Sequence, residues 1–456
     1  MARPGGTASR ALLVAALAVA LTLGATPGVG ATSHGSGASV PDRASVDQTI
    51  ERLTARTREH RQDRAAWTAL GDAFMQKARE TADASYYGRA EQAFERARAL
   101  DASDVDALVG VAWVQSARHE FEKSIESARK ALELAPGSAA AYGLLGDAAL
   151  ELGDYDLAAE HYQRMLDLRP DIAAYSRTAH LLFLTGDVRR AAWLMGKAIN
   201  AGAPYAENTA WCRAQLALMH LATGNLLAAE HMVEQAISRA PSNYHVLFAQ
   251  GRVRAARGSY AGAIDSYRRA SAIAPQHDVV VALGQLYLVT DDRKSAEQQW
   301  ALVETIARLN KANGVQGDVQ LARFLADRGR RLEESLTIAE LEFKRRPNVF
   351  VADALAWSYY KSGRYADARR AITKALAQRT PDAGIFFHAG MIYAKLGDRP
   401  TAQRHLGQAL SLNPAFDPID APIAAATLAE LGSQPPEPQD AGPDEISPSR
   451  LRRTFP

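Results

Sequence analysis

The stretch Ala139 to Pro170, AAAYGLLGDAALELGDYDLAAEHYQRMLDLRP, decides the fold of this chain. Two groups of side chains lie at helical spacing within it: Tyr142, Leu145 and Gly146 in the first half, and Ala158, Tyr162 and Met165 in the second. Gly153 favours the left-handed conformation that ends a helix, and Asp154 can cap the next helix. Pro170 closes the unit. The stretch therefore predicts two short amphipathic helices that pack as a hairpin.

This pattern returns about every 34 residues along the chain. The ends of the units fall at Ala102, Pro136, Pro170, Ala203, Pro241, Pro275, Arg308, Pro347, Thr380 and Pro414. The turn within the hairpin recurs as Gly186-Asp187, Gly224-Asn225, Gly258-Ser259, Gly363-Arg364 and Gly397-Asp398. Because one hairpin cannot bury its apolar stripe alone, we expect successive hairpins to stack on one another.

The spacing, the turn residues and the alternation of small and large side chains resemble the tetratricopeptide repeat family. Its pattern has Trp-x-x-Leu-Gly-x-x-Tyr on the first helix, which the first unit matches with Trp67, Leu70, Gly71 and Phe74. The resemblance extends from Arg64 to Pro414. It implies an all-α fold, a right-handed α-solenoid of about ten helix hairpins with capping helices at both ends. It also implies a non-catalytic module that binds another protein.

The rest of the chain is divided around this array. We expect a signal peptide at 1–31, a flexible linker at 32–43, an N-terminal capping helix at 44–63, repeats 1–7 at 64–311, a turn or hinge at 312–315, repeats 8–10 at 316–414, a C-terminal capping helix at 415–432 and a disordered tail at 433–456. The Asn313-Gly314 turn has two interpretations. It is either a hinge between two sub-arrays or the end of a longer helix followed by a long turn.

The N-terminal segment has the features of an export signal. Arg3 and Arg10 precede an apolar run from Ala11 to Leu23, and Val29-Gly30-Ala31 offers a cleavage site with small residues. We expect a secreted, periplasmic or cell-envelope protein that is not inserted in the membrane after cleavage. The alternative is an uncleaved membrane anchor. Removing these two arginines from 53 basic residues leaves 51 against 51 acidic ones, so no net charge favours nucleic acid.

Motifs for catalysis, cofactors or metal ions are missing from the sequence. There is no His-Glu-x-x-His, no Gly-rich phosphate loop, no Gly-x-Ser-x-Gly and no pair of cysteines. The single Cys212 fits a buried helical position, and the histidines are scattered over separate repeats as packing or surface residues. We therefore predict no enzyme activity, no cofactor and no metal site.

The resemblance also implies a binding surface, because in this family the first helices line a concave groove. The corresponding side chains here are Trp357, Tyr360, Phe387, Phe350, Asp353, Lys361, His388, Met391 and Trp113. Aromatic anchors beside polar groups suit a peptide or protein segment. On this hypothesis, replacing Trp357 and Tyr360 by alanine weakens the binding of a partner by about 2 kcal/mol or more without unfolding the array. The alternative is that neighbouring helices cover these side chains as core.

Two other functions remain open at this stage. The chain could be a structural scaffold of an envelope complex, through its convex face or through self-association. It could also be a small-molecule or glycan receptor, or an enzyme, although no set of residues offers a nucleophile, a base and an orienting group together.

Overall fold

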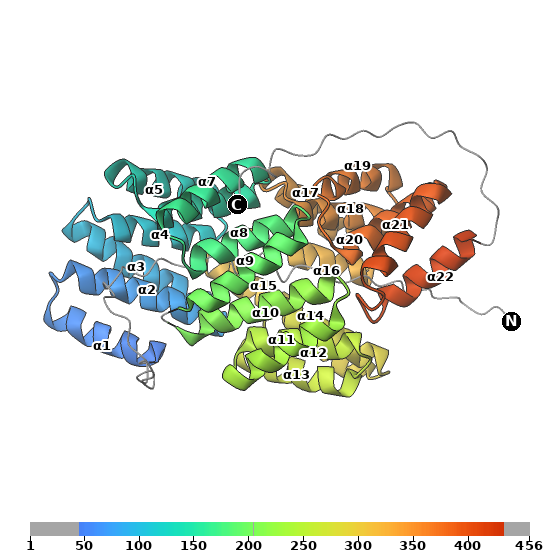
Figure 1. Cartoon of the computed structure of the whole chain (residues 1–456), viewed down its shortest axis with the longest axis horizontal. Helices are drawn as coiled ribbons and strands as arrows, with labels where there is room; N and C mark the ends of the chain where they lie inside the picture. Colours follow the sequence, from blue (N-terminus) through green and yellow to red (C-terminus); the bar gives the residue numbers. More distant parts are fainter. Residues whose placement is uncertain (1–44, 204, 433–456) are drawn as a thin grey trace.

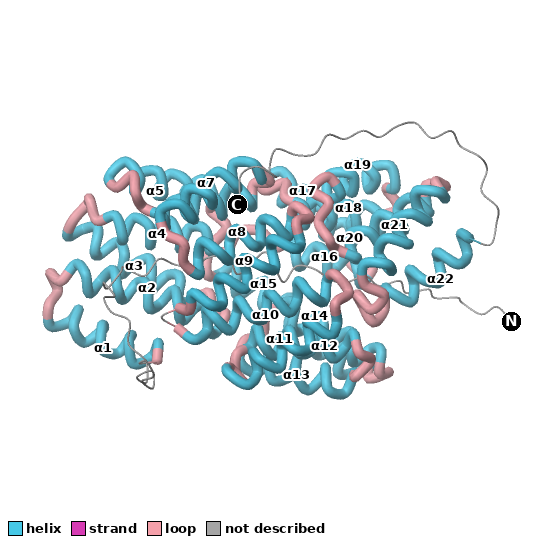
Figure 2. The backbone as a smooth tube through the Cα atoms, in the orientation of Figure 1, coloured by secondary structure: helices cyan, strands magenta, loops and turns pink. Residues whose placement is uncertain are grey.

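The computed structural model describes residues 45–203 and 205–432, and every regular element in these ranges is an α-helix (Figure 1, Figure 2). The helices are α1 (Val46–Glu59), α2 (Arg64–Thr81), α3 (Ser85–Leu100), α4 (Val105–Ala117), α5 (Phe121–Leu134), α6 (Ala139–Glu151), α7 (Tyr155–Leu168), α8 (Ile172–Leu184), α9 (Val188–Ala201), α10 (Ala206–Ala222), α11 (Leu226–Arg239), α12 (Tyr244–Ala256), α13 (Tyr260–Ile273), α14 (His277–Val289), α15 (Arg293–Ala312), α16 (Val319–Arg328), α17 (Leu332–Arg345), α18 (Val349–Lys361), α19 (Tyr365–Leu376), α20 (Ala383–Lys395), α21 (Arg399–Leu412) and α22 (Asp420–Gly432). The signal peptide, the linker and the tail expected from the sequence lie outside the described residues.

The helices from α2 to α21 form ten consecutive hairpins, with α1 and α22 at the two ends. This confirms the all-α repeat solenoid. Within the hairpin of α6 and α7, Gly146 lies directly against the ring of Tyr162, where a Cβ atom would overlap the ring. Between the two helices, Gly153 adopts φ of 79°, and the Asp154 side chain accepts a hydrogen bond from the Leu157 amide at 3.1 Å. The small residue and the turn residues thus act as the sequence pattern predicts.

The array coils so tightly that its successive superhelical turns touch. Hydrogen bonds join the turn inside one hairpin to the connection between two later hairpins. The pairs are Ala82 and Gln276, Arg118 and Gln316, Glu151 and Asn348, Leu184 and Thr380, and Leu221 and Asn413. Leu221 and Asn413 are 192 residues apart in the sequence, and Glu151 and Asn348 are 197 apart. The separation of Arg118 and Gln316 is one residue larger than that. With a repeat of about 34 residues, the superhelix closes on itself after about six repeats.

Where a closure contact is made by a turn that contains glycine, the turn has no room for a side chain. A Cβ atom on Gly153 would lie 2.8 Å from the Pro347 carbonyl oxygen, and one on Gly224 would lie 2.5 Å from the Leu412 carbonyl oxygen. The turn glycines Gly258, Gly363 and Gly397 have the same left-handed conformation but open space around them. The glycines at the points of closure therefore serve both the turn and the approach of the next superhelical turn.

The segment between α15 and α16 is tied to the second repeat. α15 is 20 residues long and ends at Ala312, as in the interpretation of a longer helix with a long turn. After it, the Gln316 amide donates to the Arg118 carbonyl at 2.9 Å, and His119 Nδ1 lies 2.8 Å from the Gln316 carbonyl oxygen. A hinge motion at 312–315 would have to break these contacts, and the hinge stays a prediction.

Substituting Gly224 and Gly258 by alanine separates the two roles of the turn glycines. Both changes place alanine in a left-handed conformation, at a cost of about 1–2 kcal/mol. Gly224→Ala also forces the Cβ atom against the Leu412 carbonyl, so we expect it to destabilise the fold by about 1–3 kcal/mol more. Chemical denaturation followed by circular dichroism measures the difference. An equal loss of unfolding free energy for the two variants would contradict a tight contact between the superhelical turns.

Candidate functional site

The side chains predicted to line the concave groove lie inside the closed superhelix. Trp357 and Phe387 are each 1% exposed, and Asp353 and His388 are fully buried. Phe350, Tyr360 and Trp113 are also buried, while Lys361 and Met391 are half-buried. The burial fits the alternative interpretation, in which these side chains are core, and the contacts of Trp357 and Phe387 come from the neighbouring helices α16 and α20 and from Phe416. That these side chains contact a partner stays a prediction, and it requires them to be uncovered.

Trp357 is the centre of the buried aromatic group. Its ring stacks on Tyr360 with centroids 4.6 Å apart and on His388 with centroids 4.1 Å apart. Its Nε1 donates a hydrogen bond of 2.8 Å to Asp327 Oδ1 on α16. Phe387 packs on the same ring and on Phe416. These contacts join the last three hairpins to one another, so Trp357 is a core residue.

Ionisable groups surround this aromatic group. Asp353 accepts hydrogen bonds from Arg323 Nη1 at 3.2 Å and from His388 Nδ1 at 2.7 Å. Burial alone would raise the pKa of Asp353, but the charge and the hydrogen bonds of these two partners hold it below its usual value. Burial raises the pKa of Asp327 and of Asp382 to about 7. The interior thus combines one firmly ionised carboxylate with carboxyl groups that titrate near neutral pH.

Several buried polar atoms in this region have no hydrogen-bond partner among the described residues. They are Asp327 Oδ2, Asp382 Oδ2, Asp417 Oδ2, His388 Nε2 and Arg323 Nε. Each such atom costs free energy if no water reaches it. The burial of the concave face therefore has an electrostatic cost, which the packing of the aromatic side chains offsets.

Trp357→Ala tests whether this tryptophan is core. We expect it to destabilise the fold by about 3–5 kcal/mol, because it removes a buried ring and leaves Asp327 Oδ1 unpaired. Trp193→Ala is the matched control, since Trp193 is 55% exposed and its loss costs about 0.5 kcal/mol or less. Urea unfolding of both variants gives the comparison. Similar stability of the two would support the open groove instead.

Asp327→Asn tests the raised pKa. Around the Asp327 carboxyl lie Arg323, Lys361, Trp357 and Asp417. The pKa of Asp327 rises from 3.8 in the unfolded chain to about 7 in the fold, so the folded state binds the proton more tightly and loses stability as pH rises from about 4 to 7. Asparagine does not titrate. As pH rises through that window, the variant should therefore gain stability relative to wild type by up to about 1.4 kcal/mol per pH unit.

The measurement for Asp327→Asn is the difference in unfolding free energy between variant and wild type at pH 5 and pH 8. Asp292→Asn is the matched control, because hydrogen bonds from Ser295 hold the pKa of Asp292 below its usual value. Its stabilising contribution is complete at both pH 5 and pH 8 and is lost only on acidification below about pH 4, so the difference for this variant should be the same at the two pH values. A difference for Asp327→Asn that does not change with pH would show that the carboxyl stays ionised throughout.

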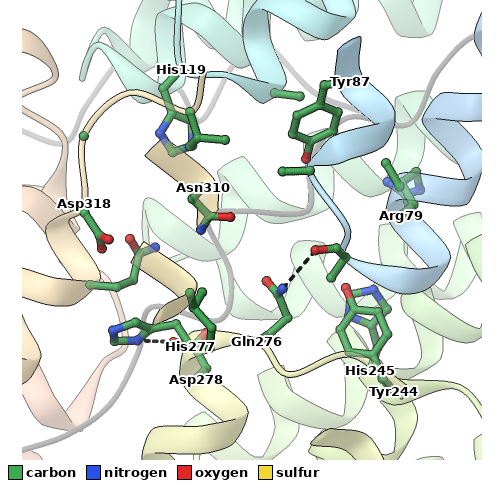
Figure 3. Close-up of a pocket in the computed structure, with 18 of the residues that line it drawn as sticks. Arg79, Tyr87, His119, Tyr244, His245, Gln276, His277, Asp278, Asn310 and Asp318 are labelled. Carbon is green, nitrogen blue, oxygen red and sulfur yellow. Dashed lines mark hydrogen bonds and ion pairs between the residues drawn. The ribbon is translucent and has the colours of Figure 1, made fainter. Parts of the chain in front are cut away.

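A cavity of about 130 Å³ lies where the first two repeats meet the sixth and seventh repeats and the loop before α16 (Figure 3). Its polar lining residues are Arg79, Tyr87, His119, Tyr244, His245, Gln276, His277, Asp278, Asn310, Asp318 and Gln320. Its apolar wall includes Met75, Ala78, Ala82, Ala117, Ile306 and Val315. The lining comes from α2, α3, α4, α12, α14, α15, the loop before α16 and the first turn of α16, so only the closure of the superhelix assembles it.

The three histidines of the cavity are neutral at physiological pH. Burial lowers the pKa of His119 and of His277 to about 3 and that of His245 to about 4. In contrast, burial raises the pKa of Asp278 and of Asp318 to about 6. At neutral pH the negative form of these carboxyl groups therefore predominates beside uncharged imidazoles.

The positively charged side chain of the cavity lining, Arg79, already forms an ion pair. The Arg79 guanidinium donates to both carboxylate oxygens of Glu207, at 3.2 Å each, and both side chains are buried. Burial alone would raise the pKa of Glu207, but Arg79 holds it below its usual value. The cavity thus has no nucleophile paired with a base, and no cluster of potential metal ligands occurs among the described residues.

Sequence reasoning did not find this cavity. The sequence indicates only a packing or surface position for His119, and no local motif joins it to His277, which lies in another repeat. The available signal was the length of α15, which sets the position of the loop that carries Asp318. Cys212 is buried, and burial raises the pKa of its thiol, as expected for a packing residue. None of the helices in the described part of the chain is long and apolar enough to span a membrane.

The outer surface carries large apolar side chains on successive second helices of the hairpins. Trp193 on α9 is 55% exposed and Leu227 on α11 is 72% exposed, while Leu157 on α7 is exposed to a smaller extent. Lys197 Nζ lies 5.2 Å from the centre of the Trp193 ring. These side chains lie on the outside of the coil and are not covered by its closure.

The sequence matches the family described as "Tetratricopeptide repeat" over residues 112–173, 215–278 and 354–402. No curated protein sequence matches the chain. A tetratricopeptide repeat protein from Parabacteroides merdae shares 17% identity over 50% of this chain and 86% of that chain, with a TM-score of 0.37. PilF of Pseudomonas aeruginosa shares 19% identity over 50% of this chain and 98% of that chain, with a TM-score of 0.38. The human IFIT1 dimer with PPP-AAAA shares 14% identity over 72% of this chain and 77% of that chain, with a TM-score of 0.42.

Proposed function

We propose that this chain, which is built from tetratricopeptide repeats, is a non-catalytic interaction module that binds a protein partner through its outer surface. Tetratricopeptide repeat proteins generally mediate protein–protein interactions and are generally non-catalytic. The surface is the part of the proposal that is specific to this chain. We place it on the second helices of the fourth and fifth repeats, around Trp193 and Leu227.

The observation that carries this choice is the difference in exposure between the two faces. The aromatic side chains of the concave face are buried, whereas aromatic and aliphatic side chains on α9 and α11 are exposed. Exposed aromatic side chains are typical of contact residues in protein interfaces, where a few large side chains contribute most of the binding free energy. The outer surface is therefore accessible without any rearrangement of the fold.

Export is the second part of the proposal, and it rests on the sequence of residues 1–31 alone. The partner would then be a protein of the cell envelope or of the medium. Binding of a peptide on the concave face is the alternative. It would require the contacts between superhelical turns, such as the bond from Asn413 Nδ2 to the Leu221 carbonyl, to open first.

The test is a pull-down from envelope and culture-supernatant fractions with the chain from Thr32 onward. We expect the double variant Trp193→Ala, Leu227→Ala to bind its partner at least about tenfold more weakly, because both side chains are exposed contact residues. The matched control is Leu302→Ala with Leu309→Ala, which removes two exposed leucines of α15. The control should bind as wild type does.

A third variant distinguishes the concave face. Thr380→Val with Asn413→Ala removes two hydrogen bonds between superhelical turns. If this variant gains binding while the change at Trp193 and Leu227 has no effect, the partner binds inside the coil and the proposed outer site is wrong. A partner that is found in neither the envelope nor the culture-supernatant fraction would contradict export.

A further inference from the structure

The outer face of α9 carries an aromatic side chain between two basic ones. Arg189, Trp193 and Lys197 are spaced four residues apart, so they lie along one side of the helix, and all three are exposed. α9 contains no Asp or Glu. These three side chains therefore form a positively charged strip with an aromatic ring at its middle, which we call the α9 stripe.

Arg189 stands where other second helices have an acidic residue. It is the second residue of α9, and the second residues of α5 and α7 are Glu122 and Asp156. An acidic side chain in the first turn interacts favourably with the helix dipole, whereas a basic one does not. Arg189 thus adds its charge to the positive end of the α9 dipole, and this end of the stripe attracts anionic groups.

Trp193 stands where other second helices have the carboxylate that neutralises the next basic residue. It is the sixth residue of α9, and in α5 and α13 an acidic sixth residue pairs with a basic residue one turn later. These pairs are Glu126 with Lys130, at 2.8 Å, and Asp265 with Arg269, at 3.8 Å. In α9 the basic residue one turn later is Lys197, whose Nζ lies over the Trp193 ring instead.

The basic groups of the α9 stripe have no acidic partner in the described part of the chain. No carboxylate oxygen of these residues lies within 4 Å of a side-chain nitrogen of Arg189 or Lys197. The acidic residue nearest in sequence is Asp187, which accepts the Arg190 amide at 3.2 Å and lies 3.8 Å from Arg190 Nη1. The charge of the stripe is therefore available to another molecule.

Building on the proposed function, we propose that the α9 stripe binds an acidic segment of the protein partner. An apolar side chain of that segment packs on Trp193, which offers a large and rigid contact area. Carboxylates on both sides of it accept hydrogen bonds from the Arg189 guanidinium and the Lys197 ammonium group. The partner is thus recognised by charge as well as by apolar contact.

The spacing of the stripe matches that of an extended chain. Because the α-helix rises about 1.5 Å per residue, neighbouring members of the stripe are about 6 Å apart along the axis. In an extended segment, alternate side chains point to the same side and are about 7 Å apart. The shortest segment that reaches all three members therefore has the pattern acid-x-apolar-x-acid.

Acidic residues on the neighbouring outer helices favour a narrow partner. Asp156 and Glu160 on α7 are exposed and take the positions that Arg189 and Trp193 have on α9. Glu234 on α11 is exposed as well. A membrane surface or a nucleic-acid duplex is wide enough to meet these carboxylates, which would repel its phosphates. An extended segment can contact α9 alone.

The experiment is a fluorescence anisotropy titration of the peptide Ser-Asp-Ser-Leu-Ser-Asp-Ser, which carries a neutral fluorophore, with the chain from Thr32 onward. Salt is kept at about 20 mM, where exposed charges are weakly screened. The matched peptide has Asn in place of both Asp residues. We expect saturable binding of the Asp peptide, and binding of the Asn peptide that is weaker by about fivefold or more.

Two variants locate the binding. Arg189→Gln with Lys197→Gln should weaken the Asp peptide by about fivefold or more, because it removes both donors to the carboxylates. The matched control is Lys123→Gln with Lys130→Gln, which removes two basic side chains of α5 that already pair with Glu120 and Glu126. The control should bind the Asp peptide as wild type does. Circular dichroism melting shows that each variant is folded.

The following outcomes overturn the proposal. Equal binding of the Asp and Asn peptides would mean that charge is not recognised, and the absence of saturable binding of the Asp peptide would exclude the ligand class. Wild-type affinity of the folded Arg189→Gln, Lys197→Gln variant would exclude the α9 stripe. Co-sedimentation with vesicles of phosphatidylcholine and phosphatidylglycerol that this variant loses, without binding of the peptide, would assign the stripe to a membrane surface.

A pull-down with the same variant separates this proposal from the proposed function. If the partner is lost with Trp193→Ala, Leu227→Ala but retained with Arg189→Gln, Lys197→Gln, the outer site is right and its preference for acidic segments is wrong. If neither variant loses the partner, the proposed outer site is wrong as the site of that partner. The peptide titration still decides in that case whether the α9 stripe binds acidic segments.

Discussion

The contact between successive superhelical turns is the constraint on which the rest of this structure depends. It is made by backbone carbonyls at the ends of hairpin turns and by side chains such as Asn348, Thr380 and Asn413 at the connections between later repeats. Because the repeats are nearly equal in length, one correct pairing places the others in register. The glycines of the paired turns let the two backbones meet, as Gly224 does at Leu412. A solenoid that is usually described by contacts between neighbouring repeats thereby gains a set of long-range contacts.

The sequence predicted the parts of the fold that depend on contacts within one or two repeats. Gly153, Asp154 and Pro170 specify a helix end, a helix start and a boundary, and these are local effects of backbone conformation and capping. The burial of Trp357 could not be predicted in the same way. Its exposure depends on how far the coil turns per repeat, which is the sum of many small rotations at helix interfaces. Sequence periodicity specifies the hairpin and leaves that sum undetermined.

The same argument explains why the cavity escaped prediction. Tyr87 and Asp278 belong to different repeats and come together only when one turn of the coil meets the next. No spacing between them has a meaning within one repeat. Among the polar contacts of the interior, the pair Glu151 and Arg346 follows the same rule because it forms across the closure. The contact between Asp327 and Trp357 does not, because it comes from the stacking of adjacent first helices.

Closure of the coil therefore decides which chemistry is available to the chain. The interior of the coil holds buried aromatic side chains and carboxyl groups whose pKa values burial raises toward neutrality, and the cost of burying these carboxyl groups grows as they ionise. The aromatic packing around Trp357 and the hydrogen bonds at Asn348 oppose that cost. A closed coil with ionisable groups inside is consequently less stable toward opening than one with an apolar interior. The outer helices are not subject to this constraint. The outer surface is therefore the part of the molecule that is available for contacts without opening of the coil. The interior can accept only a molecule that is small enough to enter.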